Sequence, residues 1–246
     1  MIADIGSWME TLAGKLEEVF GDRLLFLGLQ GSRGRGEARE DSDIDAVCVL
    51  DRLTVDDLDA YRAIIGQMPD AHLACGFICG LRQLALWPDY DLLGLLLDVK
   101  PVRGDLLEWF TLPGRQAARQ AVEIGAANLY HALCHSYLYG GRDLDSLREG
   151  YKSAFFLLRM AWYLETGVWP PTGRALLKVL EEPMEAVLPA VEPADAQDIM
   201  SAFLNWASPS AGDFSRRFDR LFAFAGDFLS HYSSKDLEAF TDAVSL

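Results

Sequence analysis

The first part of the chain combines helical and strand-like hydrophobic patterns. Between residues 9 and 20 the apolar side chains recur every three or four positions, which predicts a helix. Ser7 and Glu10 are spaced as a capping box for its start, and Gly21 is a typical end. A second helix is predicted after Thr54, which can cap it. Short apolar runs predict strands at 24–29, 44–50, 72–79 and 99–103.

The pattern changes near residue 116, where strand signals give way to long stretches of helical periodicity. Residues 154–164 are apolar almost all round, as in the central helix of a bundle. Gly167 ends this helix. We therefore predict a first domain at residues 1–112 and a helical bundle domain at 113–246. Within the bundle we expect a loop at 180–193 and helices at 195–206 and 213–232.

Nothing in the hydrophobic pattern predicts a membrane segment or a secretory signal. The most apolar window spans about eleven residues and includes Arg159, whereas a membrane-spanning helix needs about twenty. No basic stretch followed by an apolar run stands at the start. The four cysteines have no zinc-ligand spacing, so we expect four buried thiols in a reducing cytoplasm. They are Cys48, Cys75, Cys79 and Cys134.

The charge balance narrows the choice of partners. The net charge is −15 and the pI about 4.6, so the protein repels phosphate backbones at long range and duplex nucleic acid is a poor partner. Residues 1–110 carry a net charge of −10 and residues 111–246 one of −5. Any polyanion bound to the first domain must therefore be held by a local device or a bridging cation.

One constellation predicts such a device. Gly31 and Ser32 follow a predicted strand, and after ten residues Asp43 and Asp45 flank the start of the next. Residues two apart in a strand project from the same face, so the two carboxylates would lie about 6.5 Å apart. Such a pair suits a Mg²⁺ ion that also binds phosphates. Glycine and serine offer backbone N–H groups and a hydroxyl with little bulk. Positive charge is added by Arg33, Arg35 and Arg39.

Each half of this constellation also has a plain structural interpretation. An Asp-x-Asp pair alone is more often a solvated strand end, and glycines with arginines more often form a flexible basic loop. The two halves at this separation are far more specific, and together they predict a site for the phosphates of a nucleotide.

Residues 31–45, GSRGRGEAREDSDID, closely resemble the signature of the DNA polymerase β-like nucleotidyltransferase superfamily. They are most similar to its small bacterial branch of minimal and aminoglycoside nucleotidyltransferases. More weakly, the second domain resembles the helical bundles of the kanamycin nucleotidyltransferase C-terminal or HEPN-like type. The resemblance implies an α+β fold class: a small mixed sheet with flanking helices, followed by an all-α helical bundle.

The resemblance also implies an activity. A nucleoside monophosphate, AMP from ATP or the equivalent from another NTP, would move to a hydroxyl of a small molecule or protein, with release of pyrophosphate. Asp43 and Asp45 would hold two Mg²⁺ ions as the catalytic residues. Gly31 and Ser32 would hold the triphosphate, Arg35 would contact the leaving phosphates, and Ser42 would order the loop. The acidic surface favours a cationic acceptor such as an aminoglycoside.

The sequence departs from the superfamily in one respect. A later strand usually supplies a third carboxylate, but residues 72–79 contain no Asp or Glu. Asp98 is the first candidate for the missing metal ligand, followed by Asp89, Asp91 and Glu165. The alternative is therefore a catalytically weak or inactive module of the same fold that binds a nucleotide or a partner. The helical bundle would form either a wall of the acceptor pocket or a protein interface. In the second case the protein could be a homodimer.

Overall fold

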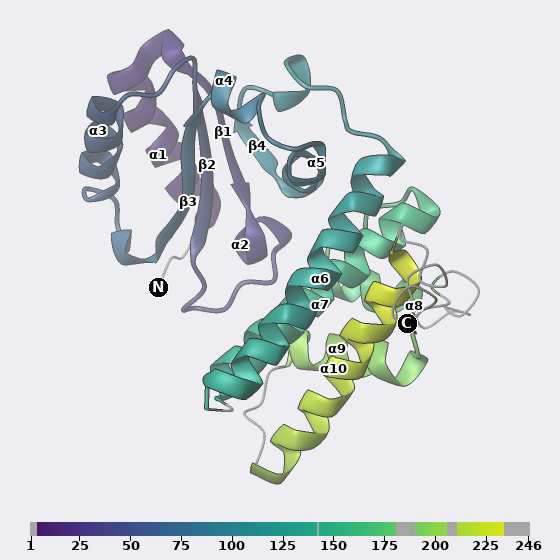
Figure 1. The fold of residues 1–246 in the computed structure, drawn as a ribbon. Helices are drawn as coiled ribbons and strands as arrows, with labels where there is room; N and C mark the ends of the chain where they lie inside the picture. The colour runs from purple at the N-terminus through teal and green to yellow at the C-terminus, as the bar shows by residue number, and fades with distance from the viewer. Residues whose placement is uncertain (1–3, 142, 181–187, 189–190, 206–210, 234–246) are drawn as a thin grey trace. The chain divides into compact units, whose positions relative to one another are not determined.

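The computed structural model describes most of the chain as two compact units. The described residues are 4–141, 143–180, 188, 191–205 and 211–233. The first unit comprises residues 1–114 and the second residues 115–246. Figure 1 shows a sheet with helices in the first and only helices in the second. The predicted fold class, a small sheet with flanking helices followed by a helical bundle, is confirmed.

The sheet of the first unit has the strand order β3-β2-β1-β4. β1 pairs antiparallel with both β2 and β4, whereas β2 pairs parallel with β3. The sheet is therefore mixed, and β2 and β1 are its central strands. The strands are β1 (Leu24–Gln30), β2 (Ile44–Leu50), β3 (Ala74–Gly80) and β4 (Lys100–Arg103).

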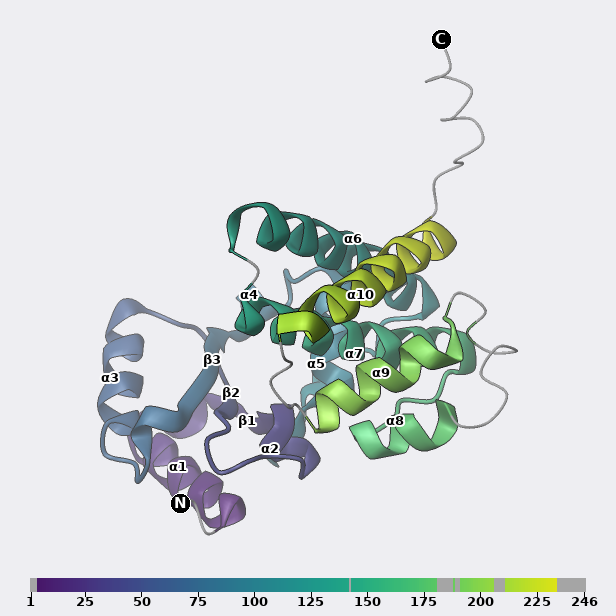
Figure 2. The same ribbon diagram turned by 90° about the horizontal axis from the view of Figure 1, so that it is seen from below.

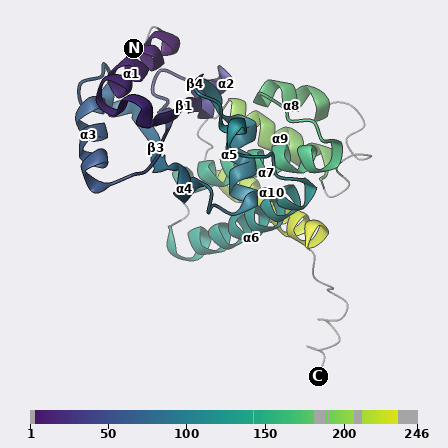
Figure 3. The same ribbon diagram turned by 90° about the horizontal axis from the view of Figure 1, so that it is seen from above.

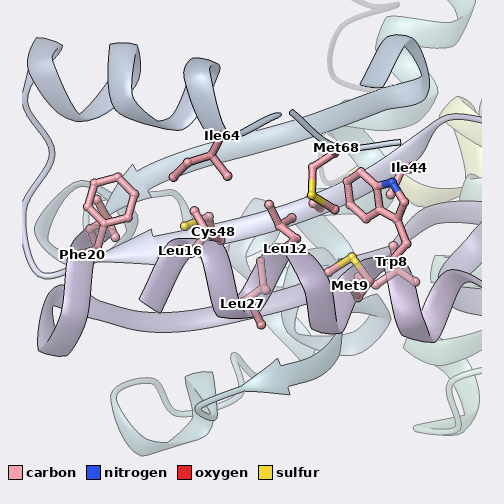
Figure 4. Packing of buried hydrophobic residues seen from close by; sticks show 14 residues of the cluster. Trp8, Met9, Leu12, Leu16, Phe20, Leu27, Ile44, Cys48, Ile64 and Met68 are labelled. Carbon is pink, nitrogen blue, oxygen red and sulfur yellow. The ribbon is translucent and has the colours of Figure 1, made fainter. Parts of the chain in front are cut away.

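Two helices cover one face of this sheet: α1 (Ile5–Phe20) and α3 (Val55–Ile65). α1 turns a continuous apolar stripe toward the strands, and Figure 4 shows this stripe against side chains of β1, β2 and α3. Burying these side chains is the main stabilising contribution of the face, at about 25 cal/mol per Å² of apolar surface. The cluster includes Trp8, Met9, Leu12, Leu16, Phe20, Leu27, Ile44, Ile64 and Met68.

The opposite face of the sheet is covered by α5 (Asp89–Asp98), which follows the short helix α4 (Leu81–Leu84). Figure 3 shows α5 on the side of the sheet away from α1 and α3. Because side chains alternate along a strand, Val47 and Val49 of β2 point to this face. They pack there with Phe26, Leu84, Leu92, Leu95 and Leu106.

Several local predictions need correction. α1 begins earlier than predicted, because the Asp4 carboxylate accepts from the N–H of Gly6 at 2.9 Å and caps the helix. Residues 31–35, whose plain structural interpretation was a flexible basic loop, form the one-turn helix α2 (Gly31–Arg35). Val55 and Leu58, apolar residues of α3, are exposed. Three 3-10 helices complete the unit, at Gly21–Arg23, Ala71–Leu73 and Leu106–Glu108.

Over its described residues, the second unit is helical wherever it is regular. Aromatic pairs join its long helices. The ring centroids of Tyr130 in α6 and Phe222 in α10 are 4.9 Å apart, and those of the stacked Phe155 in α7 and Phe203 in α9 are 3.5 Å apart. Figure 2 shows these helices side by side. The helices are α6 (Arg115–Tyr139), α7 (Leu144–Thr166), α8 (Gly173–Leu180), α9 (Pro193–Leu204) and α10 (Ala211–Tyr232).

Two predictions for this unit fall partly outside the described residues: most of the loop at 180–193, and Trp206 at the end of a predicted helix. Arg159 of α7 is fully buried, and its guanidinium donates to the carbonyl of Pro170 at 2.7 Å. Among the helices that the structure describes, none is both long and apolar enough to cross a membrane.

Candidate functional site

The antiparallel pairing of β1 with β2 assembles the two halves of the predicted constellation. Gln30, the last residue of β1, pairs with Asp45, so the turn after β1 lies beside the start of β2. Gly31 has a φ of 70°, and a Cβ added there would overlap the carboxylate of Asp45. Only glycine fits this position without strain. Residues fourteen apart in the chain thus meet at one edge of the sheet.

The two aspartates differ in environment. Asp43 precedes the first residue of β2 and is exposed, whereas Asp45 is within β2 and half-buried. Strand alternation places Asp45 on the same face as Val47, the face that α5 covers. The carboxylates are therefore at the end of the sheet where this apolar face meets the turn.

Arg33 holds the loop that leads to Asp43. Its guanidinium donates to the carbonyl of Ser42 at 2.7 Å and to those of Glu40 and Asp43 at 3.3 and 3.2 Å. The hydroxyl of Ser42 accepts from the backbone N–H of Arg39 at 2.8 Å. These bonds order the backbone before Asp43. The same bonds occupy the guanidinium of Arg33, whose positive charge the sequence analysis had counted toward the phosphate site.

Arg35 is buried and paired. Its Nη1 lies 2.8 Å from Oδ2 of Asp98, and its Nε lies 3.3 Å from Oε2 of Glu37. Arg35, predicted to contact phosphates, and Asp98, predicted to bind a metal, therefore bind each other. Of the three arginines in the motif, only Arg39 is exposed.

β3 lies on the other side of β2. The parallel register pairs Asp45 with Cys75, an exposed residue of an edge strand. The sequence alone could not place Cys75 beside Asp45, because no local pattern indicates which strands pair. The strand expected to carry a third carboxylate thus places a thiol there.

The other candidates for the third carboxylate are accounted for. Asp89 and Asp91 are exposed in the first turn of α5, the opposite end of the helix from Asp98. Glu165 of the helical unit lies 3.0 Å from Arg115 of the same unit. In the part of the chain that the structure describes, no three acidic, histidine or cysteine side chains group as metal ligands.

The expectation of four buried thiols is wrong for two of them. Cys48 and Cys79 are buried, whereas Cys75 is exposed and Cys134 half-buried, and all four are free. Burial raises the pKa of Cys48 to about 12 and that of Cys79 to about 11. Cys75 is therefore the accessible thiol of the first unit.

Comparisons with known proteins identify similar families and folds. Residues 9–100 match the family model of the nucleotidyltransferase domain. The fold is similar to the crystal structure of the spectinomycin adenyltransferase AAD(9) from Enterococcus faecialis with ATP and spectinomycin. The TM-score is 0.56 at 15% identity, over 89% of this chain and 98% of that one. No curated protein matches the sequence.

Proposed function

We propose that this chain, which carries a nucleotidyltransferase domain of the polymerase β-like superfamily at residues 9–100, transfers a nucleoside monophosphate to a hydroxyl group. The nucleotide would be ATP, and the transferred group AMP. The observation that carries this proposal is the β1–β2 register, which sets the Gly31–Ser32 turn against Asp45 with Asp43 next to it.

The residues at this edge have distinct tasks in the proposed reaction. The turn at Gly31 presents backbone N–H groups and the hydroxyl of Ser32 to the phosphates, and it admits them closely because Gly31 has no side chain. Arg33 and Ser42 keep the preceding loop in place, which fixes the position of Asp43. The acceptor oxygen bonds to the α-phosphorus as the bond to pyrophosphate breaks.

Asp43 and Asp45 fit Mg²⁺, because hard carboxylate oxygens two residues apart are the ligands that this ion shares with phosphates. When bound, Mg²⁺ would neutralise phosphate charge and lower the pKa of the acceptor hydroxyl. The charge distribution supports the same ion. Residues 1–110 carry a net charge of −10, so a triphosphate without its cation would be repelled.

The same acidity supports a small cationic acceptor. An excess of carboxylates raises the local concentration of cations and lowers that of anions such as nucleic acids. The similar structure holds spectinomycin together with ATP, which makes spectinomycin and other aminoglycosides the first acceptors to try. Protein hydroxyls remain the second class.

The test is pyrophosphate release from each NTP with Mg²⁺ and a panel of acceptors: spectinomycin, other aminoglycosides, a neutral polyol and the protein itself. We expect ATP and a cationic acceptor to be preferred. Asp43→Asn and Asp45→Asn should each lower the rate by about 100-fold or more, because losing one preorganised electrostatic contact already costs that much. Asp41→Asn, an exposed carboxylate of the same loop, should act as wild type. Equal rates in all three variants would contradict the metal site.

A second candidate function is a nucleotide-binding module with little or no catalysis. The observation that favours it is the pairing of Asp45 with Cys75, since β3 lacks a carboxylate and Asp98 is bound to Arg35. Calorimetry with Mg-ATP separates the two functions. Binding without turnover on any acceptor would favour the module, and turnover would exclude it.

A further inference from the structure

An ionic cluster that is largely shielded from water connects α2, the helix that begins at Gly31 and Ser32, to α5. It consists of Arg35, Glu37 and Asp98, whose side chains are only 5%, 12% and 15% exposed. The guanidinium of Arg35 meets one oxygen of each carboxylate, at 2.8 Å for Asp98 and 3.3 Å for Glu37. Ions so removed from water are retained only when they are paired.

The two helices that this cluster joins differ greatly in their own stability. α2 has five residues, far fewer than a helix needs to be stable by itself. α5 is anchored by Leu92 and Leu95, which pack in the hydrophobic cluster of the first unit. Arg35 is the last residue of α2 and Asp98 the last of α5. Their ion pair therefore ties a marginal helix to an anchored one.

We propose that Arg35 and Asp98 are positioning residues that hold α2 so that its first residues, Gly31 and Ser32, receive the nucleotide phosphates. This inference rests on the proposed function, because it assigns the support of the same phosphate site. Arg33 fixes the loop after α2, and the Arg35–Asp98 pair fixes α2 against the body of the unit. Arg33 and Arg35 thus hold the two segments on either side of the same turn.

A direct contact between Arg35 and phosphate is the competing role. To make it, the guanidinium would have to leave Asp98 and Glu37, and each would then be a largely buried carboxylate without that partner. Such a loss is costly. Positioning requires no rearrangement, and the two roles make opposite predictions for Asp98.

The experiment measures the Kd of Mg-ATP by calorimetry for wild type, Arg35→Gln, Asp98→Asn and the double variant. Positioning predicts that each single variant binds about tenfold more weakly, the usual effect of removing a supporting residue. It predicts that the double variant is no weaker than the weaker single variant, because both changes break one pair. Arg35→Lys, which keeps a charge for Asp98, should recover part of the affinity.

The matched control is Arg103→Gln. Arg103 of β4 also bridges two carboxylates in the same unit, those of Glu10 and Glu17 at 2.6 and 2.7 Å. Its pairs tie β4 to α1 and do not involve α2. We expect its loss to leave the Kd of Mg-ATP unchanged. A merely structural role for Arg35 would lower the folded fraction but not the Kd of the folded protein.

Hydrogen exchange gives a readout without nucleotide. In Asp98→Asn the backbone amides of residues 31–36 should exchange faster than in wild type, whereas in Arg103→Gln they should not. Wild-type affinity in Asp98→Asn with weak binding in Arg35→Gln would establish direct contact and overturn the inference. A wild-type protein that binds no Mg-nucleotide would overturn the proposed function instead. Unchanged exchange in Asp98→Asn would overturn the inference by itself.

Discussion

The two neighbours of β2 present opposite surroundings to Asp45. On the β1 side, Gly31 with its positive φ lies against the carboxylate, Ser32 follows it in the chain, and Arg33 braces the loop that leads to Asp43. On the β3 side, the facing residue is Cys75, within a strand that has no acidic residue. One side of the aspartate pair is thus built of polar groups held in place, and the other is apolar with one thiol.

This difference separates binding from catalysis. Backbone N–H groups, a hydroxyl and two carboxylates are the groups that would hold a nucleotide with its cation in the proposed function. A third carboxylate would add a metal ligand or a base, and β3 does not supply one. Changes on the β1 side should therefore abolish nucleotide binding, whereas changes on the β3 side should tune cation affinity and the rate of transfer from the bound nucleotide.

The largest effect is expected on the β1 side, from Gly31→Ala. The added methyl group overlaps the carboxylate of Asp45 at a φ of 70°, so the Asp45 side chain or the turn must shift. A shift of about 1 Å can cost about 100-fold in function, and we expect a loss of that size in Mg-ATP affinity by calorimetry.

Gly36→Ala is the matched control for this variant. Gly36 has a similar φ of 73°, but a Cβ there meets no atom within 4 Å. It should cost about 1 kcal/mol of unfolding free energy for the backbone strain alone and leave affinity nearly unchanged. Equal losses of affinity in both variants would show that strain, and not contact with Asp45, is the cause.

A smaller effect, of opposite sign, is expected on the β3 side from Cys75→Asp. The new carboxylate would stand at the position paired with Asp45, and each added anionic ligand strengthens binding of a hard divalent cation. We expect Mn²⁺ or Mg²⁺ affinity to rise about tenfold by calorimetry, with faster pyrophosphate release. Without the cation, like-charge repulsion should destabilise the fold by roughly 0.2–1 kcal/mol.

Cys75→Ser controls for the lost thiol and should bind the cation as wild type does. If Cys75→Asp also binds the cation no more tightly than wild type does, position 75 does not reach the cation. The missing carboxylate of β3 would then not explain a weak activity.

The smallest perturbation is thiol labelling of the unmodified protein at pH 8. Only the thiolate reacts, and Cys48 and Cys79 remain protonated because burial raises their pKa values to about 12 and about 11. They should become reactive only as the pH approaches those values. Cys75 should react first in this unit, and Mg-ATP should slow its labelling several-fold, as mass spectrometry of each cysteine peptide can measure. Early labelling of Cys48 would contradict the burial.

Much of the local structure was predictable because it depends on near neighbours in the chain. β2 has the predicted bounds, since a central strand buried on both faces is a continuous apolar run. α3 begins at Thr54, whose hydroxyl accepts from the N–H of Asp57 at 3.3 Å. The start of α1 was missed because the capping-box spacing indicated Ser7, whereas the carboxylate of Asp4 caps the helix.

The roles of charged residues were less predictable. Arg35 and Asp98 are 63 positions apart, and nothing near either residue in the chain indicates the other. The pairing of Asp45 with Cys75 is equally non-local. The resemblance to the superfamily implied a phosphate contact for Arg35 and made Asp98 the first candidate for a metal ligand.

The sequence by itself determined which chemistry is available and where it stands along the chain: a small turn after one strand and two carboxylates at the start of the next. Short-range backbone preferences and side-chain alternation suffice for that. Only the tertiary structure decided that β1 runs antiparallel to β2, that Cys75 pairs with Asp45 in the sheet register, and that Arg35 forms an ion pair with Asp98. Strand pairing and ion burial join distant residues, so their free energies arise only when the chain has folded.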